Sequence, residues 1–276
     1  MNNFYKRSLT GVVFVLVLGG GILINSFTLF ALVGVIIGMG LLEFYKLIAN
    51  TQLKANKPLG LAIGLLFFAI ACLYSIGLIG ITGFWLVAPL VSSVFIAELY
   101  RKHEFPFQNI AITLFGVFYI AIPLSLLTLI GFPERSTMGY HQHLIMGFFF
   151  LLWASDTGAY LTGITIGKHP MFPRISPKKS WEGFAGGLIL TLLVALIISK
   201  YFVELPRTDW IVIAIIICIF GVWGDLIESM LKRSLQIKDS GNILPGHGGI
   251  LDRFDSVLFS APLVFVYLQL KNLMLF

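Results

Sequence analysis

The sequence predicts an all-α integral membrane protein with about nine transmembrane helices. Of its 276 residues, 58% are hydrophobic and only 12% are charged, whereas soluble domains carry about 25% charged residues. Many apolar runs reach the roughly 20 residues that cross a hydrocarbon core. We therefore expect one polytopic membrane domain over residues 1–276.

The apolar runs set the expected spans in order. Residues 9–48 hold two spans with a turn at Asn25-Ser26, and residues 58–99 hold two more with a turn near 80–83. Pro58 suits the first turn of a helix. The fifth and sixth spans are expected at 107–130 and 143–166. After a basic link at 167–182, the last three are expected at 183–203, 210–231 and 256–274.

The basic residues fall mainly on one side of this arrangement. With nine spans, one face receives the N-terminus and every loop after an even-numbered span. Of the 19 Lys and Arg, only four fall on the other face: Arg135, Lys200, Arg207 and Lys271. Because Lys and Arg concentrate in cytoplasmic loops, we expect the N-terminus in the cytoplasm.

Three polar patches fall on the expected cytoplasmic side, and the first is centred on Asp156. This carboxylate lies within the sixth span, in the stretch 156–160. A carboxylate in a transmembrane helix is costly and usually faces a polar cavity. The simpler alternative is a helix-end aspartate that bonds a neighbouring helix or is solvated by headgroups.

The second patch covers residues 176–183, SPKKSWEG. Adjacent Lys178 and Lys179, with the hydroxyls of Ser176 and Ser180, precede a predicted helix start. Lysines supply positive charge and the free N–H groups of a helix start point at an anion, so this patch favours phosphate binding. The alternative is membrane anchoring, with Trp181 in the interfacial belt.

The third patch covers residues 224–255 and carries the most charge. On a helix, Asp225 and Glu228 share one face, and Asp252 and Asp255 start the last helix from the other side of a loop. Two facing acidic pairs favour a cage for Mg²⁺, which takes carboxylate and water oxygens and shares substrate phosphates. Salt bridges on a solvated loop are the alternative, and we expect one for Asp239.

A glycine-rich turn and four cations complete this patch. The glycines around His247 let backbone N–H groups approach an anion closely. His247 itself is either a phosphate contact, a proton donor or a hydrogen-bond scaffold, and we assign it no acid–base role. The cations that would neutralise a bound anion are Lys232, Arg233, Lys238 and Arg253.

The third patch resembles the signature of the phosphatidate cytidylyltransferases (CDP-diacylglycerol synthases) of bacterial type. The resemblance lies in Ser229-x-Leu231-Lys232-Arg233, Lys238-Asp239-Ser240-Gly241 and the run Leu244-Pro245-Gly246-His247-Gly248-Gly249-Ile250-x-Asp252-Arg253-Phe254-Asp255. The stretches 156–160, with Gly163 and Gly167-Lys168, and 176–183 resemble other motifs of the same family. The resemblance covers roughly residues 150–260.

This resemblance implies that CTP and phosphatidic acid react to give CDP-diacylglycerol and diphosphate, with Mg²⁺, in phospholipid biosynthesis. It implies N-terminal transmembrane helices over 1–142, a catalytic part over 143–276, and a polar cavity that opens to the cytoplasmic side of a bacterial inner membrane. The expected partners are CTP, phosphatidic acid and the bilayer, without nucleic acid. The resemblance also suggests that a second, monovalent cation shares the site and that the protein forms a homodimer.

The patches and the resemblance together assign residue roles. The expected catalytic residues are Asp225, Asp252, Asp255, Lys232 and Arg233. The expected metal ligands are Asp225, Asp255, Asp252 and Asp156. The expected substrate-binding residues are Ser176, Lys178, Lys179, Ser180, Glu182, Ser229, Lys238, Asp239, Gly246, His247, Gly248, Gly249 and Arg253.

Three other functions compete with this interpretation. A CTP-dependent polyprenol or phytol kinase would move the γ-phosphoryl group to a hydroxyl, and the full signature at 229–255 argues against it. A cation transporter would use Asp156 and Asp225 as ion ligands, but its charged site is expected near the membrane midplane. A non-enzymatic scaffold has no use for carboxylates within the membrane.

Overall fold

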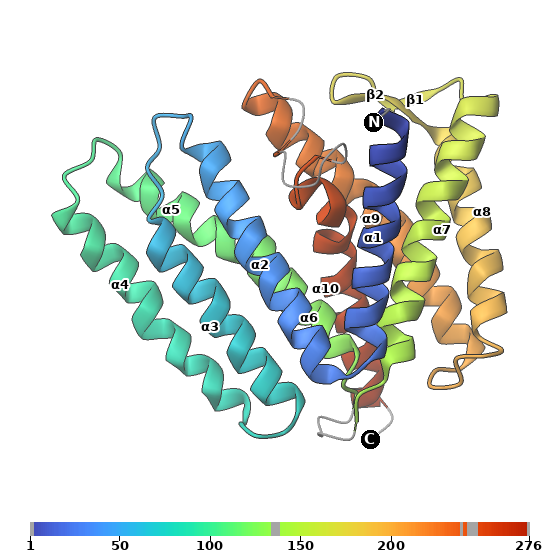
Figure 1. The fold of residues 1–276 in the computed structure, drawn as a ribbon, viewed down its shortest axis with the longest axis horizontal. Helices are drawn as coiled ribbons and strands as arrows, with labels where there is room; N and C mark the ends of the chain where they lie inside the picture. Colours follow the sequence, from blue (N-terminus) through green and yellow to red (C-terminus); the bar gives the residue numbers. More distant parts are fainter. Residues whose placement is uncertain (1–2, 134–138, 238–239, 242–247, 275–276) are drawn as a thin grey trace.

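The structure is a computed structural model that describes residues 3–133, 139–237, 240–241 and 248–274 (Figure 1). Its elements begin with α1 (Asn3–Leu23), α2 (Ser26–Ile48), α3 (Lys57–Ser75), the 3₁₀ helix η1 (Ile81–Leu86) and α4 (Val87–Tyr100). They continue with α5 (Pro106–Gly116), the π-helical turn η2 (Val117–Ala121) and α6 (Ile122–Ile130). The remaining elements are α7 (Gln142–Ile166), β1 (Pro170–Phe172), β2 (Ser176–Ser180), α8 (Trp181–Ile198), α9 (Arg207–Ser234) and α10 (Leu251–Met274).

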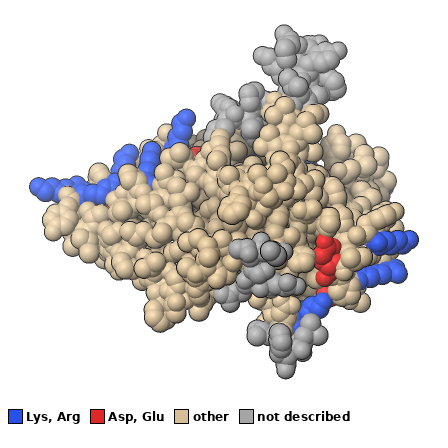
Figure 2. Space-filling model, turned by 60° about the horizontal axis from the view of Figure 1, so that its bottom comes forward, with Lys and Arg blue, Asp and Glu red and all other residues tan. Residues whose placement is uncertain are grey.

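The helices confirm an all-α membrane protein. Among the described residues, eight helical stretches are long and apolar enough to cross a membrane, and Thr10–Leu23 of α1 is a shorter apolar helix. The start of α1 lies at the same end of the bundle as the loops that follow α2, α4, α7 and α9, whereas α10 finishes at the opposite end (Figure 1). Lys and Arg gather toward the edges of the molecule, and the surface between them is largely uncharged (Figure 2).

Local sequence signals explain several helix boundaries. Asn25 caps α2, because its side chain accepts a hydrogen bond from Thr28 N at 2.9 Å and its own N–H bonds the Thr28 hydroxyl. This confirms the predicted turn. Asn56 caps α3, and Pro58 lies in its first turn as expected. Pro123 lacks an N–H and its ring crowds the carbonyl four residues earlier, which accounts for the π turn η2 just before it.

Two boundaries differ from the sequence expectation. The last helix begins at Leu251, not Ser256, so Asp252 and Asp255 lie inside its first turns. A span placed only by its apolar residues begins too late when the first turn of the helix is charged. The link between α7 and α8 contains an antiparallel hairpin, β1 with β2, in which Pro170 pairs with Ser180. Strands this short, rich in Pro and Lys, show no alternating pattern.

The helices form two groups that meet along α10. Helices α3, α4 and α5 lie on one side, α7, α8 and α9 lie on the other, and α2 and α6 lie between them (Figure 1). The most extensive helix contact is between α7 and α8, followed by α9 with α10, and α10 also packs against α6 and α2. The division at residue 142 stays a prediction.

Candidate active site

The polar patches of the second half meet around one cavity of about 360 Å³. Its charged lining residues come from α7, the hairpin, α9 and α10, and its apolar lining residues include Tyr160, Met171, Phe184 and Val222. The sequence-predicted residues that line this cavity are Asp156, Lys178, Lys179, Ser180, Asp225, Asp252 and Asp255.

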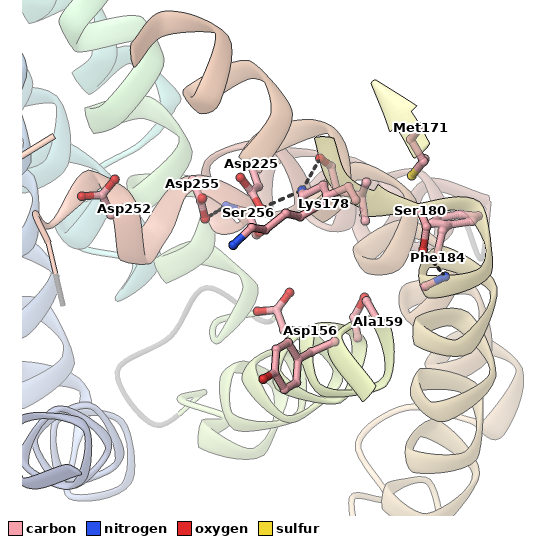
Figure 3. A pocket seen from close by; sticks show the side chains of 15 residues that line it. Asp156, Ala159, Met171, Lys178, Ser180, Phe184, Asp225, Asp252, Asp255 and Ser256 are labelled. Atoms are coloured by element: carbon pink, nitrogen blue, oxygen red, sulfur yellow. Dashed lines mark hydrogen bonds and ion pairs between the residues drawn. The ribbon is translucent and has the colours of Figure 1, made fainter. Parts of the chain in front are cut away.

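Three carboxylates face this cavity from three helices. Asp225 of α9 and Asp255 of α10 lie together on one wall, and Asp156 of α7 points into the cavity from below them in this view (Figure 3). Gly224 makes this possible, since a Cβ there would collide with the backbone oxygen of Asp255. All three carboxylates line the same cavity.

The hairpin brings two lysines to these carboxylates. The ammonium of Lys179 lies 2.7 Å from Asp225 Oδ2 and donates to the Val222 carbonyl at 3.3 Å. Asp225 also accepts a hydrogen bond from the Ser229 hydroxyl at 3.2 Å. Lys178 is exposed, lines the same cavity and makes no ion pair with a described residue. Lys178 is therefore the cation most available to a ligand.

The two predicted acidic pairs, Asp225 with Glu228 and Asp252 with Asp255, do not form one cage, because Glu228 and Asp252 pair with Lys232. Lys232 forms an ion pair with buried Glu228 and a second, at 2.7 Å, with Asp252 Oδ1. Asp252 Oδ2 accepts hydrogen bonds from Ser240 and from Gly249 N. Lys232, Glu228 and Asp252 thus join α9 to the start of α10, and Asp252 lies farther from the other carboxylates in Figure 3.

Glu43 of α2 holds the start of α10 from the N-terminal half. Its carboxylate is 4% exposed and accepts hydrogen bonds from Ile250 N at 2.8 Å, from Leu251 N at 3.2 Å and from the Ser240 hydroxyl. The Glu43 carboxylate can lie this close only because residue 249 is glycine, since a Cβ there would collide with it. Glu43 is not among the residues that the motifs predict, although a carboxylate in an apolar run is itself a signal.

The remaining residues of the second patch shape the hairpin. Ser180 caps α8, since its hydroxyl accepts a hydrogen bond from Gly183 N at 3.1 Å. Glu182 accepts from the backbone N–H groups of Lys168 and His169 and lies 2.5 Å from His169 Nδ1. Both residues were expected to bind substrate, and both are used to fix the hairpin against α8.

Several expected residues lie elsewhere. Arg233 is exposed at the end of α9, where it donates to the Ile237 carbonyl. Arg253 lines a neighbouring cavity of about 140 Å³ with Asp156 and Asp255. Ser176 begins β2, and Gly248 has a positive φ of 81° beside Asp252. Lys238, Asp239, Gly246 and His247 lie outside the described residues.

The carboxylates fit a metal ion by chemistry rather than as a closed cage. The described residues contain no group of three or more His, Cys, Asp and Glu that could hold a metal by itself. Mg²⁺, however, is usually bound through one or two carboxylates plus substrate phosphates and water. Asp225, Asp255 and Asp156 supply such oxygens to one cavity.

Comparison with known sequences assigns the family. A sequence model of the Cytidylyltransferase family matches residues 5–271. This chain belongs to the cytidylyltransferase family. The family match confirms the resemblance drawn from residues 229–255, and it extends over the N-terminal helices that the motifs leave out.

Curated members of this family include close relatives. The phosphatidate cytidylyltransferase of Staphylococcus aureus (strain COL) is 44% identical over 184 residues, which make up 65% of this chain and 68% of the relative. The phosphatidate cytidylyltransferase of Staphylococcus haemolyticus is 45% identical over 170 residues, or 60% of this chain and 62% of the relative. That of Staphylococcus epidermidis is 41% identical over 184 residues, with coverage of 65% and 68%.

Proposed function

We propose that this protein is a phosphatidate cytidylyltransferase, which converts CTP and phosphatidate to CDP-diacylglycerol and diphosphate. The observation that carries the proposal is the cavity in which Asp156, Asp225 and Asp255 meet Lys178 and Lys179. This arrangement, in a chain of the cytidylyltransferase family, suits a reaction between two phosphates. The names of the curated relatives support the choice of phosphatidate as acceptor.

The main requirement of this reaction is that the protein brings two anionic substrates together. An oxygen of the lipid phosphate attacks the α-phosphorus of CTP, and the bond from that phosphorus to the departing diphosphate breaks. The attacking oxygen is already ionised at neutral pH, so no general base is required. Positioning and charge stabilisation therefore supply the catalysis, which agrees with a cavity whose described lining residues include carboxylates and lysines but no histidine.

The cavity residues divide this work. Lys178, which has no described carboxylate partner, would contact a phosphate group of CTP or the lipid. Lys179 holds Asp225 in place and stabilises negative charge beside it. Asp225, Asp255 and Asp156 would hold Mg²⁺, which would neutralise charge on the phosphates of CTP while the cytidylyl group is transferred. Lys232 and Asp252 position the start of α10 rather than touching substrate.

The membrane setting follows from the substrates. A diacyl lipid reaches the protein from the bilayer, and the side chains of Tyr160 and Phe184, which line the cavity, would give its glycerol backbone and upper acyl chains an apolar surface. CTP comes from the cytosol. Most Lys and Arg belong to the N-terminus and to the links that follow α2, α4, α7 and α9, which lie at one end of the bundle together with the hairpin (Figure 1). This bias supports a cytoplasmic N-terminus and an active site on the cytoplasmic side of a bacterial inner membrane.

Two labelled nucleotides test the proposal. Purified protein in detergent is given Mg²⁺, phosphatidate and CTP labelled either at the α- or at the γ-phosphorus. We expect α-label in the lipid fraction and γ-label only in released diphosphate, in equal amounts. Transfer of γ-label to a polyprenol would instead show a lipid kinase, and the absence of turnover on every lipid acceptor would contradict an enzymatic function.

A further inference from the structure

A second polar cavity lies in the N-terminal half, and none of its lining residues belongs to the candidate active site. Its volume is about 460 Å³. It is bounded by the end of α2, the loop that leads to α3, the start of α3 and the link after α4. Four of its lining residues are basic, and none is acidic: Lys54, Lys57, Arg101 and His103.

The loop that forms one side of this cavity is fixed by buried polar residues of α5. Lys54 N donates to Asn109 Oδ1 at 2.7 Å, and Asn56 N donates to the Thr113 hydroxyl at 2.8 Å. Asn109 and Thr113 are 1% and 0% exposed. The Tyr45 hydroxyl, which also lines the cavity, donates to the Thr113 carbonyl at 2.7 Å. Burying such groups stabilises a fold only when they are bonded, so this loop has one defined shape.

The positive charge of the cavity is not cancelled. Arg101 pairs with buried Glu98 at 2.8 Å, and Asn109 Nδ2 donates to the other oxygen of Glu98. Lys54 and Lys57, by contrast, are exposed and form no ion pair with a described residue. Their side chains leave two net positive charges at the mouth of the cavity.

Apolar surface lies directly beside this charge. Leu99 and Tyr100 at the end of α4 are 80% and 81% exposed, and Phe107 at the start of α5 is 77% exposed. Lipid tails cover such side chains in a membrane, and aromatic residues mark the headgroup level. The cavity therefore lies where the phosphate of a lipid and its first methylene groups meet the protein.

We propose that this cavity binds the phosphate headgroup of an anionic phospholipid. Basic pockets at the cytoplasmic ends of transmembrane helices bind such headgroups. Exposed lysines are attracted to an anionic membrane surface even without a binding cavity. Here the lysines line a cavity, and the loop that carries them is fixed by buried hydrogen bonds, so the arrangement favours a defined site. The adjoining apolar surface favours a lipid over free phosphate.

Native mass spectrometry of the full chain in neutral detergent tests this site independently of turnover. The protein is titrated with phosphatidylglycerol, with net-neutral phosphatidylcholine of the same chains, and with inorganic phosphate as a competitor. The variant Lys54→Gln/Lys57→Gln removes the two unpaired charges. Lys46→Gln/Lys102→Gln is the matched control, because Lys46 and Lys102 are exposed nearby but do not line the cavity.

We expect the cavity variant to bind one phosphatidylglycerol fewer than the wild type, with an affinity loss of about thirtyfold from two headgroup-level lysines. The control should bind as the wild type does, and phosphatidylcholine should not compete. Equal binding by both variants would overturn the proposal. Displacement of the lipid by inorganic phosphate at a similar concentration would show a site for a free anion and would also overturn it.

Discussion

Replacing Glu43 by glutamine tests how the N-terminal half supports the candidate active site. The substitution keeps the size of the side chain and removes its charge. One oxygen of Glu43 accepts from both Ser240 and Leu251, and the other accepts from Ile250. A glutamine can keep one acceptor, but its NH₂ group must then face a backbone N–H that needs an acceptor.

The expected loss can be worked out from these bonds. A hydrogen bond to a charged group contributes about 1.5–3 kcal/mol, and an orphaned buried donor costs a similar amount. We expect the unfolding free energy to fall by about 2–3 kcal/mol, which lowers the unfolding midpoint by about 5 °C or more. Asp255 lies in the following helical turn, and a misplacement of about 1 Å can reduce turnover about a hundredfold.

Turnover of CTP with phosphatidate and thermal unfolding in detergent measure both effects. Glu104→Gln is the matched control, since Glu104 is exposed in the link after α4. The control should match the wild type. If Glu43→Gln also retains wild-type turnover and the same unfolding midpoint, the buried carboxylate does not hold the start of α10 in the way described.

Four further changes have defined outcomes. Gly224→Ala puts a Cβ against the Asp255 backbone oxygen and should cost about 1–3 kcal/mol of stability and most of the turnover, whereas Gly38→Ala, with open space around it, should cost neither. Lys178→Gln should raise the KM for CTP or for phosphatidate about tenfold by removing a charged hydrogen bond, and an unchanged KM for both substrates would exclude the assigned contact. Lys232→Met should destabilise the protein by about 3–5 kcal/mol, because it strands buried Glu228, and adding Glu228→Gln should recover part of this loss in a thermal unfolding assay. Chelation of divalent metal should stop turnover, Mg²⁺ should restore it, and circular dichroism should show unchanged helix content, whereas continued turnover in chelator would refute the metal requirement.

The sequence predicts the membrane architecture well because lipid imposes simple rules. Each helix must satisfy its own backbone and be apolar over about 20 residues, so the spans and the turn at Asn25 can be read directly. The start of α10 is different. Its first turns carry Asp252 and Asp255, and it is held by Glu43 from a helix some 200 positions earlier, as the separation of 207 between Glu43 and Ile250 shows.

The sequence could indicate which residues line the candidate site, but it could not indicate which of them form ion pairs and hydrogen bonds with one another. Asp156, Lys178, Lys179, Asp225 and Asp255, which the motifs single out, line one cavity, and their roles stay a prediction. Helical spacing is consistent with the Glu228–Lys232 ion pair, which joins positions four apart on α9. It cannot show that Lys232 also pairs with Asp252, because that contact depends on how α9 and α10 pack. The structural use of Ser180 and Glu182 likewise depends on a hairpin that no local pattern indicates.

The most direct test of the central claim combines ion binding and turnover in Asp255→Asn. Mn²⁺, observed by electron paramagnetic resonance, replaces Mg²⁺ in the presence of CTP, and Glu104→Gln, at an exposed position in the link after α4, is the control. We expect Asp255→Asn to bind Mn²⁺ at least about tenfold more weakly, as expected for a lost ligand, and to make no CDP-diacylglycerol while remaining folded. Wild-type Mn²⁺ affinity and normal turnover in this variant would contradict the proposal that the cavity between α7, α9 and α10 is the active site.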